Sequence, residues 1–351
     1  MNNVLLISPT WVNIHIDIVD GLKKLGYQVE FIEEYNFSSD PYKIRGRKHA
    51  LSLREAEELK KTYWQTKLNG TQTVFDYLLV VDGCGVNGFL FEELRRRNPN
   101  IYCVNYLYDT TYWTYHFEKC FSYYDRVVSF DISDAENHKI DLLPIYWVDN
   151  EKKSESCCAY EIFGYGAYSP ERLLFFSQIT DIAQELGVSC FAKIYHREIN
   201  NLLLYRLYLV GRKLMGLPSL ISASEYSSEI VSHDLIPPEK FRDMINAADV
   251  VLDTKVQNQD GLTARFMWAL GLGKKIITTN DSAAKFDFCS KEQVLIIKGG
   301  IVGECEKNLI AEFIKAPLKI PAGATNKIEC LKINNWLKNL LKNKNIAGFS
   351  V

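Results

Sequence analysis

Short apolar runs alternate with amphipathic helical patterns along almost the whole chain, and this alternation limits the folds open to it. In the first half, runs such as Val4–Ser8, Tyr77–Asp82 and Ile101–Tyr106 are separated by helix-length segments such as Ile14–Leu25. Strands that are apolar along their whole length are buried on both faces, as in parallel sheets covered by helices. A strand over Leu142–Val148 is expected to close this set. The pattern starts again at Ala159–Gly164, and helices are expected over Pro170–Leu186, with Pro at its first turn, and over Asn200–Met215. The sequence therefore predicts an α/β protein with two doubly wound, Rossmann-like domains.

The length of the chain also favours two domains. A chain of 351 residues is longer than one hydrophobic core usually serves. We expect an N-terminal domain over residues 1–150, a C-terminal domain over 157–325, and a helix with a tail over 326–351 that can cross back. Because ligands bind at the carboxyl ends of strands in open parallel sheets, the two domains are expected to face each other across a binding cleft.

Charge and cysteine content exclude several classes of protein. The formal net charge of −2 gives no indication of nucleic-acid binding. The nine cysteines include no C-x-x-C pair, so neither a disulfide framework nor a zinc site is expected. The sequence contains no apolar run of about 18 residues and no signal-peptide pattern at its start. We therefore expect a cytoplasmic protein.

The stretch from Val250 to Asn280 has the pattern of an anion site. A strand, Val250–Asp253, is followed by a polar loop and by Gly261, which opens a helix. The free amides and the dipole of a helix N-terminus attract anions. Gly261 would let a phosphate approach the backbone, and Thr263 and Arg265 would add donors. No P-loop motif occurs in the sequence.

The helical periodicity of this segment divides its residues between two faces. Leu262 and Phe266 share the face expected to pack against the sheet, whereas Gly261, Arg265 and Trp268 share the other. On an outward face, the Arg could hold a phosphate and the Trp a ring. The alternative is a solvated helix face with one chance aromatic residue.

A G-x-G-x-x-G motif at residues 83–88 follows the third predicted strand, and Asp109 lies 21 residues beyond it. This spacing fits a dinucleotide-binding fingerprint, but that fingerprint normally follows the first strand of its domain. Three interpretations remain open: an NAD site, a tight structural turn, or a loop in which Gly83 and Gly85 touch an acceptor.

The second domain has a smaller glycine pattern of its own. Gly164 and Gly166 flank Tyr165 after the expected first strand, and Arg172 follows six residues later. A glycine turn followed by a cation suits a phosphate, and Lys193 could supply a second cation. The alternative for Lys193 is an ordinary lysine at the end of a strand.

Three blocks of sequence resemble bacterial capsule and lipopolysaccharide glycosyltransferases of the GT-B architecture. The first consists of YLYD at residues 106–109, YDRVVSFD at 124–131, Asp134, and LPIY at 143–146. The second is the helix and strand over 241–253. The third, and most specific, is QDGLTAR at 259–265 with GKKIITTN at 273–280. This chain has Trp268 where such proteins usually have a Glu that holds the donor ribose or sugar.

The resemblance implies sugar transfer from a nucleotide-sugar donor to a growing, often lipid-linked, glycan. Cations of the second domain would neutralise the leaving diphosphate, with no metal and no cofactor, and Asp109 or Asp82 of the first domain would act as base. The expected donor-binding residues are Gly164, Gly166, Arg172, Lys193, Gln259, Gly261, Leu262, Thr263, Arg265 and Trp268. The expected acceptor-binding residues are Thr10, Trp11, His15, Gly83 and Gly85. His15 and His196 could equally be structural.

Two basic segments could touch an anionic membrane: Lys43–Lys48, and the lysines around Trp336 in the tail. Their alternative is a solvated charged surface. Two other functions stay open, namely an NAD-dependent oxidoreductase that uses residues 83–88, and a non-catalytic partner in a polysaccharide assembly complex.

Overall fold

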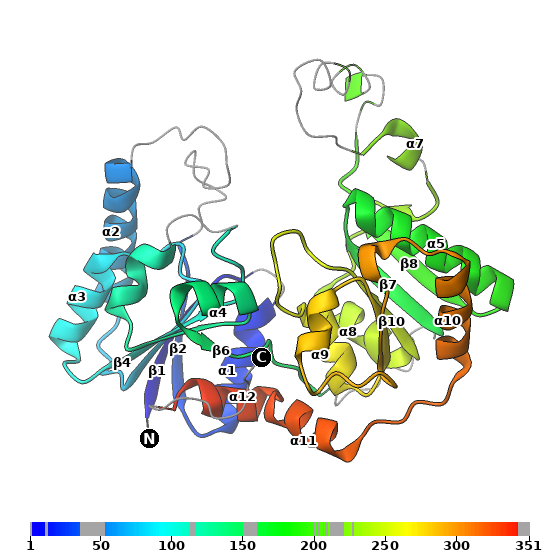
Figure 1. Ribbon diagram of the computed structural model, residues 1–351. Helices are drawn as coiled ribbons and strands as arrows, with labels where there is room; N and C mark the ends of the chain where they lie inside the picture. Colours follow the sequence, from blue (N-terminus) through cyan, green and yellow to red (C-terminus); the bar gives the residue numbers. More distant parts are fainter. Residues whose placement is uncertain are drawn as a thin grey trace. The chain divides into compact units, whose positions relative to one another are not determined.

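The computed structural model describes residues 2–10, 13–35, 53–112, 117–149, 160–199, 221–226 and 228–342, with positions 201, 204, 205, 207 and 210. These residues form two compact units (Figure 1). Unit 1 takes the chain up to Val148, the segment Gln257–Ala264, and the chain from Lys327 onward. Unit 2 takes Asp149–Val256 and Arg265–Asn326.

Unit 1 contains a six-stranded sheet in the order β2-β1-β3-β4-β5-β6, in which every pair of neighbouring strands is parallel. The strands are β1 (Asn3–Ser8), β2 (Gln28–Glu33), β3 (Tyr77–Val81), β4 (Tyr102–Leu107), β5 (Arg126–Ser129) and β6 (Asp141–Leu142). The helices are α1 (Ile14–Lys24), α2 (Leu53–Asn69), α3 (Gly88–Arg97), the 3-10 helix η3 (Phe117–Tyr123), α4 (Ile132–His138) and α12 (Ile333–Leu340).

Unit 2 contains a second six-stranded parallel sheet, in the order β12-β11-β10-β7-β8-β9. Its strands are β7 (Ile162–Ala167), β8 (Cys190–Tyr195), β9 (Val231–Ser232), β10 (Val250–Asp253), β11 (Lys275–Thr278) and β12 (Val294–Ile296). Its helical segments are α5 (Pro170–Leu186), α7 (Ala223–Tyr226), α8 (Pro238–Ala247), α9 (Ala264–Gly271), η4 (Asp281–Lys285), η5 (Lys298–Gly300) and α10 (Glu304–Lys315), and α11 (Ala322–Cys330) continues from unit 2 into unit 1.

The two parallel sheets confirm the fold class predicted from the alternating pattern. Strand residues such as Leu5 and Leu79 are fully buried, as expected for strands covered on both faces. Helix α5 begins and ends where predicted, because Ser169 caps its start through a bond from the Arg172 amide and Gly187 adopts the left-handed conformation at its end. The helix expected over 200–215 lies mostly outside the described residues.

Some elements differ from the prediction. The expected strand over 142–148 is only Asp141–Leu142. Helices α4 and α10 were not predicted. None of the helices in the described part of the chain is both long and apolar enough to cross a membrane.

The C-terminal helix α12 returns to unit 1, as the fold class predicted. It packs so closely on α1 that a Cβ at Gly21 would lie 2.6 Å from the side chain of Leu337. Arg126 donates to the carbonyls of Asn339 and Leu340, at 2.8 and 2.9 Å. Since the last carbonyls of a helix have no partner within the helix, this buried guanidinium closes the C-terminus of α12.

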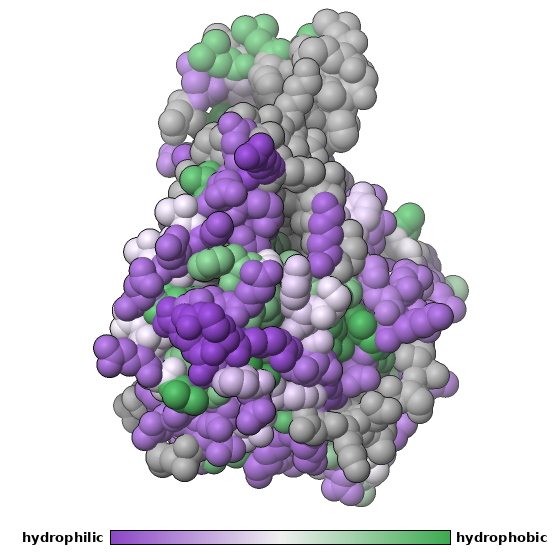
Figure 2. All heavy atoms as spheres, turned by 90° about the vertical axis from the view of Figure 1, so that its left-hand side faces the viewer, coloured by the Kyte–Doolittle hydropathy of each residue, from purple (hydrophilic) through white to green (hydrophobic). Residues whose placement is uncertain are grey.

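The face of the molecule on the side of α2 and α3 is mostly hydrophilic (Figure 2). On α3, Arg96 and Arg97 form ion pairs with Glu93 of the same helix. These charges belong to a solvated helix face and not to the strand ends where ligands usually bind.

Candidate functional site

The strand order of unit 2 reverses between β7 and β10, which is where open α/β sheets usually bind ligands. Arg265 lies at this point. Its Nη2 is 3.0 Å from Oδ1 of Asp253, the last residue of β10, and Nη1 donates to the Tyr165 carbonyl in β7. Asp253 is completely buried. The guanidinium is therefore fixed between the two strands.

A second guanidinium, that of Arg172 on α5, lies near the first. Its Nε donates to Thr254 Oγ1 at 2.8 Å, and its Nη1 donates to the Ala167 carbonyl. Burial, and then the neighbouring Arg265 charge, lower the Arg172 pKa to about 10. Within the described residues, Arg172 forms no ion pair. Two cations close together at a strand edge can hold a phosphate or diphosphate.

The glycines predicted to form a phosphate loop lie inside β7, so that prediction was wrong about the local structure. A Cβ at Gly164 would lie 3.0 Å from Leu252 and from Phe176, and a Cβ at Gly166 would lie 2.8 Å from the Arg172 guanidinium. Gly166 therefore leaves room for Arg172. The Lys193 ammonium group donates a hydrogen bond to the Glu229 carbonyl, at 2.6 Å.

The prediction that Arg265 and Trp268 occupy an outward face of their helix was also wrong. Their exposed fractions are only 8% and 5%. The Arg242 guanidinium on α8 lies 4.5 Å from the centre of the Trp268 ring, and Phe241 packs edge-on against it. Periodicity shows that α9 has two faces, but it cannot show that α8 covers the second.

The indole Nε1–H of Trp268 is buried and has no hydrogen-bond partner among the described residues. An indole can donate but not accept a hydrogen bond, so Trp268 cannot replace an acidic residue as an acceptor. Its role in donor binding stays a prediction.

The expected open space beside Gly261 is filled. A Cβ at this position would lie 2.5 Å from the Phe130 ring. The Gly261 and Asp260 amides donate to Oδ2 of Asp131, at 2.7 and 2.5 Å. The backbone amides that we expected to bind a phosphate thus donate their hydrogen bonds to a carboxylate of the protein itself. Gln259 and Leu262 are buried, and Thr263 is half-buried.

Asp131 and Asp134 are the functional candidates that the residue-by-residue reasoning missed. Asp131 caps α4 by accepting the Asp134 amide, and burial raises its pKa although these amide bonds oppose the shift. Asp134 accepts two bonds from Thr111, from its amide at 2.9 Å and from its hydroxyl at 2.5 Å. Both acids stand in the SFD-x-x-D block that carries the resemblance, so a signal was present without an assigned role.

The two candidate bases of unit 1 have different surroundings. Asp82 follows β3 with a left-handed φ of 62°, is buried, and accepts the amides of Tyr108 and Asp109 at 2.9 Å each. Asp109 is half-buried, and its carboxylate accepts the amide of Thr110. Asp82 orders the loop after β4, and Asp109 is the more accessible carboxylate. Their catalytic roles stay predictions.

The glycine loop at residues 83–88 closes over a buried carboxyl group, that of Glu34. Gly83 and Gly85 both donate their amides to the buried Glu34, and the Gly85 carbonyl accepts the Trp64 indole N–H at 2.8 Å. Burial raises the Glu34 pKa to about 8, with Asp82 contributing and the two amides opposing the shift. A Cβ at Gly85 would lie 2.7 Å from the Tyr35 carbonyl. These contacts favour the structural turn over an NAD site, because an internal carboxyl group already accepts hydrogen bonds from the amides.

The remaining acceptor candidates lie near β1 and β2. The Thr10 hydroxyl donates to Glu33 at 2.8 Å. His15 stacks on Phe31 with a ring separation of 4.9 Å. Trp11 lies outside the described residues, as does the basic segment Lys43–Lys48.

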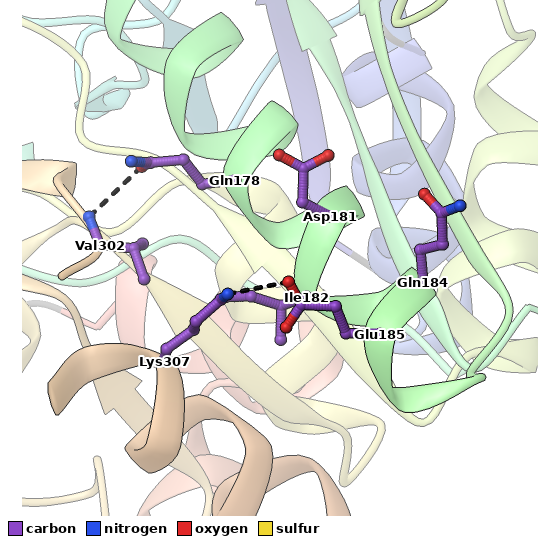
Figure 3. A pocket seen from close by; sticks show the side chains of 7 residues that line it. All are labelled: Gln178, Asp181, Ile182, Gln184, Glu185, Val302 and Lys307. Atoms are coloured by element: carbon purple, nitrogen blue, oxygen red, sulfur yellow. Dashed lines mark hydrogen bonds and ion pairs between the residues drawn. The ribbon is translucent and has the colours of Figure 1, made fainter. Parts of the chain in front are cut away.

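A groove on the helical side of unit 2 has a volume of about 480 Å³ and is shown in Figure 3. Two pairs of its lining residues bond to each other: Lys307 forms a 2.8 Å ion pair with Glu185, and Gln178 accepts the Val302 amide. No strand end lines this groove. In the described part of the chain, no group of three or more His, Cys, Asp or Glu residues could hold a metal ion.

No protein-family model and no curated protein matches the sequence. Solved structures match almost the whole chain. The α,α-trehalose-phosphate synthase (UDP-forming) from Burkholderia vietnamiensis is 10% identical over 97% of both chains, with a TM-score of 0.58. The N-terminal domain of Candida albicans trehalose-6-phosphate phosphatase is 11% identical over 98% of this chain and 97% of its own, with a TM-score of 0.57.

S. aureus MnaA, in a structure with UDP, is 10% identical over 100% of both chains, with a TM-score of 0.52. The chain has the GT-B fold. At this level of identity the comparison establishes the fold alone, and the chemistry has to be argued from the residues.

Proposed function

We propose that this protein is a glycosyltransferase that moves a sugar from a nucleotide-sugar donor to a growing cell-surface glycan, such as a capsule, an O-antigen or a lipopolysaccharide. The observation that carries the proposal is the pair of guanidinium groups, Arg172 and Arg265, at the strand reversal of unit 2. Two such groups suit the diphosphate of a donor and its charge on leaving.

The comparisons support a uridine nucleotide as the first donor to test, since one structure contains UDP and another enzyme is UDP-forming. In the proposed reaction, the acceptor hydroxyl attacks the anomeric carbon of the donor sugar, and the bond to the diphosphate oxygen breaks. The diphosphate leaves with the bonding electron pair, next to Arg172 and Arg265. If the reaction inverts the configuration, Asp109 takes the hydroxyl proton.

A thermal-shift screen with UDP-, GDP-, CMP- and dTDP-sugars tests the donor. A ligand that binds only the folded state at 100 times its Kd stabilises the protein by about 2.7 kcal/mol. We expect one nucleotide class to raise Tm in the wild type and to lose this effect in Arg172→Met. Arg96→Met is the matched control, because Arg96 is a surface arginine paired with Glu93. Absence of any shift in the wild type contradicts the proposal.

A non-catalytic partner of a polysaccharide assembly complex is the second candidate, and Trp268 is the observation that favours it. An indole in place of a carboxylate removes a hydrogen-bond acceptor from the helix that carries Arg265. Nucleotide binding without release of nucleoside diphosphate, in the presence of lipid-linked saccharide acceptors, would support this candidate. Turnover with any donor excludes it.

An NAD-dependent oxidoreductase would have to use the 83–88 loop, whose amides bond to Glu34. The same thermal-shift screen should include NAD and NADH. We expect no shift from either.

A further inference from the structure

One turn of α4 supplies two carboxylates to two different loops of unit 1. Asp131, the N-cap, receives the amides of Asp260 and Gly261 on a single oxygen, and its other oxygen receives the Asp134 amide. Asp134, three residues later, receives the amide and the hydroxyl of Thr111. Hydrogen bonds to an ionised acceptor are roughly twice as strong as neutral ones, so both loops are firmly held.

The loop held by Asp131 is Gln257–Ala264, which leads directly into Arg265. Two further contacts fix it to unit 1. The Ser133 hydroxyl donates to the Asp260 carboxylate at 2.5 Å, and Gly261 lies so close to Phe130 that any side chain would collide with the ring. The segment immediately before Arg265 is therefore held by α4 and by the residue before its N-cap.

The loop held by Asp134 follows β4 and carries Asp109. It is fixed at both ends, because Asp82 accepts the amides of Tyr108 and Asp109 while Asp134 accepts those two bonds from Thr111. His138, at the last turn of α4, lies 3.4 Å from the Thr111 hydroxyl. Asp109 is thus bracketed by two buried carboxylates.

We infer that Asp131 and Asp134 are positioning residues with separate tasks: Asp131 places the segment that leads into the donor-binding Arg265, and Asp134 places the loop of the candidate base Asp109. This inference rests on the proposed function for the meaning of the two loops. The contacts themselves can be measured without any ligand.

The variants Asp131→Asn and Asp134→Asn test the inference as a matched pair. Asparagine is also a good N-cap, so Asp131→Asn keeps the start of α4 while it weakens the bonds to Asp260 and Gly261. Hydrogen exchange of the unliganded protein should quicken about tenfold over 257–264 in Asp131→Asn only, and over 108–112 in Asp134→Asn only, as expected for loss of a bond to a charged group. If both variants change both loops equally, the separate tasks are refuted.

Steady-state kinetics with the nucleotide sugar identified by the screen supply the second readout. Asp131→Asn should raise the donor KM about tenfold and keep kcat at saturating donor within about twofold. Asp134→Asn should leave the donor KM unchanged and lower kcat. An unchanged donor KM in Asp131→Asn overturns the inference even if hydrogen exchange quickens.

A third variant changes Gly261, whose amide donates to Asp131, in place of Asp131 itself. Gly261→Ala places a methyl group against Phe130, and we expect it to raise the donor KM in the same way as Asp131→Asn. The double variant should then show less than the sum of the two effects, because both remove one anchor. If the wild type binds no nucleotide sugar, the proposed function fails, whereas the exchange experiment still decides whether the two acids hold separate loops.

Discussion

The carboxyl-end edges of the two sheets are lined by different kinds of ionisable side chain. In unit 1 the edge is acidic, with Glu34, Asp82 and Asp131 all accepting backbone amides. In unit 2 the edge is basic, with Arg172 and Arg265 donating to backbone carbonyls. Both edges belong to six-stranded parallel sheets. Strand ends do not build the core, so a similar framework can carry either charge.

The acids of the unit 1 edge and the arginines of the unit 2 edge suit different roles. At this edge of unit 1, Asp82 and Asp131 are buried acceptors that order loops, and Asp109 is a more accessible carboxylate. The two arginines of unit 2 are held by neutral carbonyls and by a single carboxylate, that of Asp253, which offsets only one of their two positive charges. This contrast is the physical basis for placing the donor with unit 2 and the base with unit 1.

The largest expected effect comes from removing the central cation of the basic edge. Arg265→Ala leaves the fully buried Asp253 carboxylate without its ion-pair partner. Breaking a buried pair in this way costs about 3–5 kcal/mol of the free energy of unfolding, measured by chemical denaturation. The double variant Asp253→Asn/Arg265→Met should recover part of the loss. A cost below about 1 kcal/mol would show that the pair is not buried.

A buried cation away from the strand reversal sharpens the comparison. Arg126→Met in unit 1 and Lys275→Met in unit 2 each remove a cation that donates to the last carbonyls of a helix, α12 and α10 respectively. Each should lower the free energy of unfolding by about 2 kcal/mol. Neither should change nucleotide affinity, and a loss of affinity in Arg126→Met would argue against the strand edge of unit 2 as the anion site.

The acidic edge predicts an unusual pH dependence. Because the Glu34 pKa is raised from 4.5 to about 8 in the folded state, its favourable contribution is complete below pH 4.5 and is lost as the pH rises to about 8. The stability of the wild type relative to Glu34→Gln should therefore fall across this range. Glu93 is the control of opposite sign, since ion pairs with Arg96 and Arg97 lower its pKa to about 2. Its contribution should be lost as the pH falls from 4.5 towards 2.

The smallest expected effect is at an exposed pair on the basic edge. Lys255 lies 2.8 Å from Asp281, and 35% and 61% of their side chains are exposed. Lys255→Ala should change the free energy of unfolding by less than about 0.5 kcal/mol, because solvent screens such pairs. A larger loss would mean that the basic edge stabilises the fold and not only the ligand.

Sequence reasoning worked best where one local rule decided the outcome. Pro at a first helical turn marked the helix Pro170–Leu186, which are the bounds of α5, and buried strands such as Val250–Asp253 were predicted from their apolar composition alone. It failed for glycines. Gly164, Gly166 and Gly261 were expected to admit a phosphate, yet each leaves room for a side chain of the protein itself. A glycine indicates that another group lies close to the backbone, but the sequence does not tell whether that group is a ligand or a side chain of the protein.

The sequence by itself determined the two parallel α/β units, since apolar runs of strand length must be covered on both faces. It also placed Arg265 in the first turn of the helix that follows the loop after Asp253. Only the tertiary structure decided that Trp268 is buried beneath Arg242, that Glu34 fills the glycine loop, and that Asp131 takes the amides before α9. These contacts join residues far apart in the chain, and a periodicity reports which face of an element is apolar but not which partner covers it.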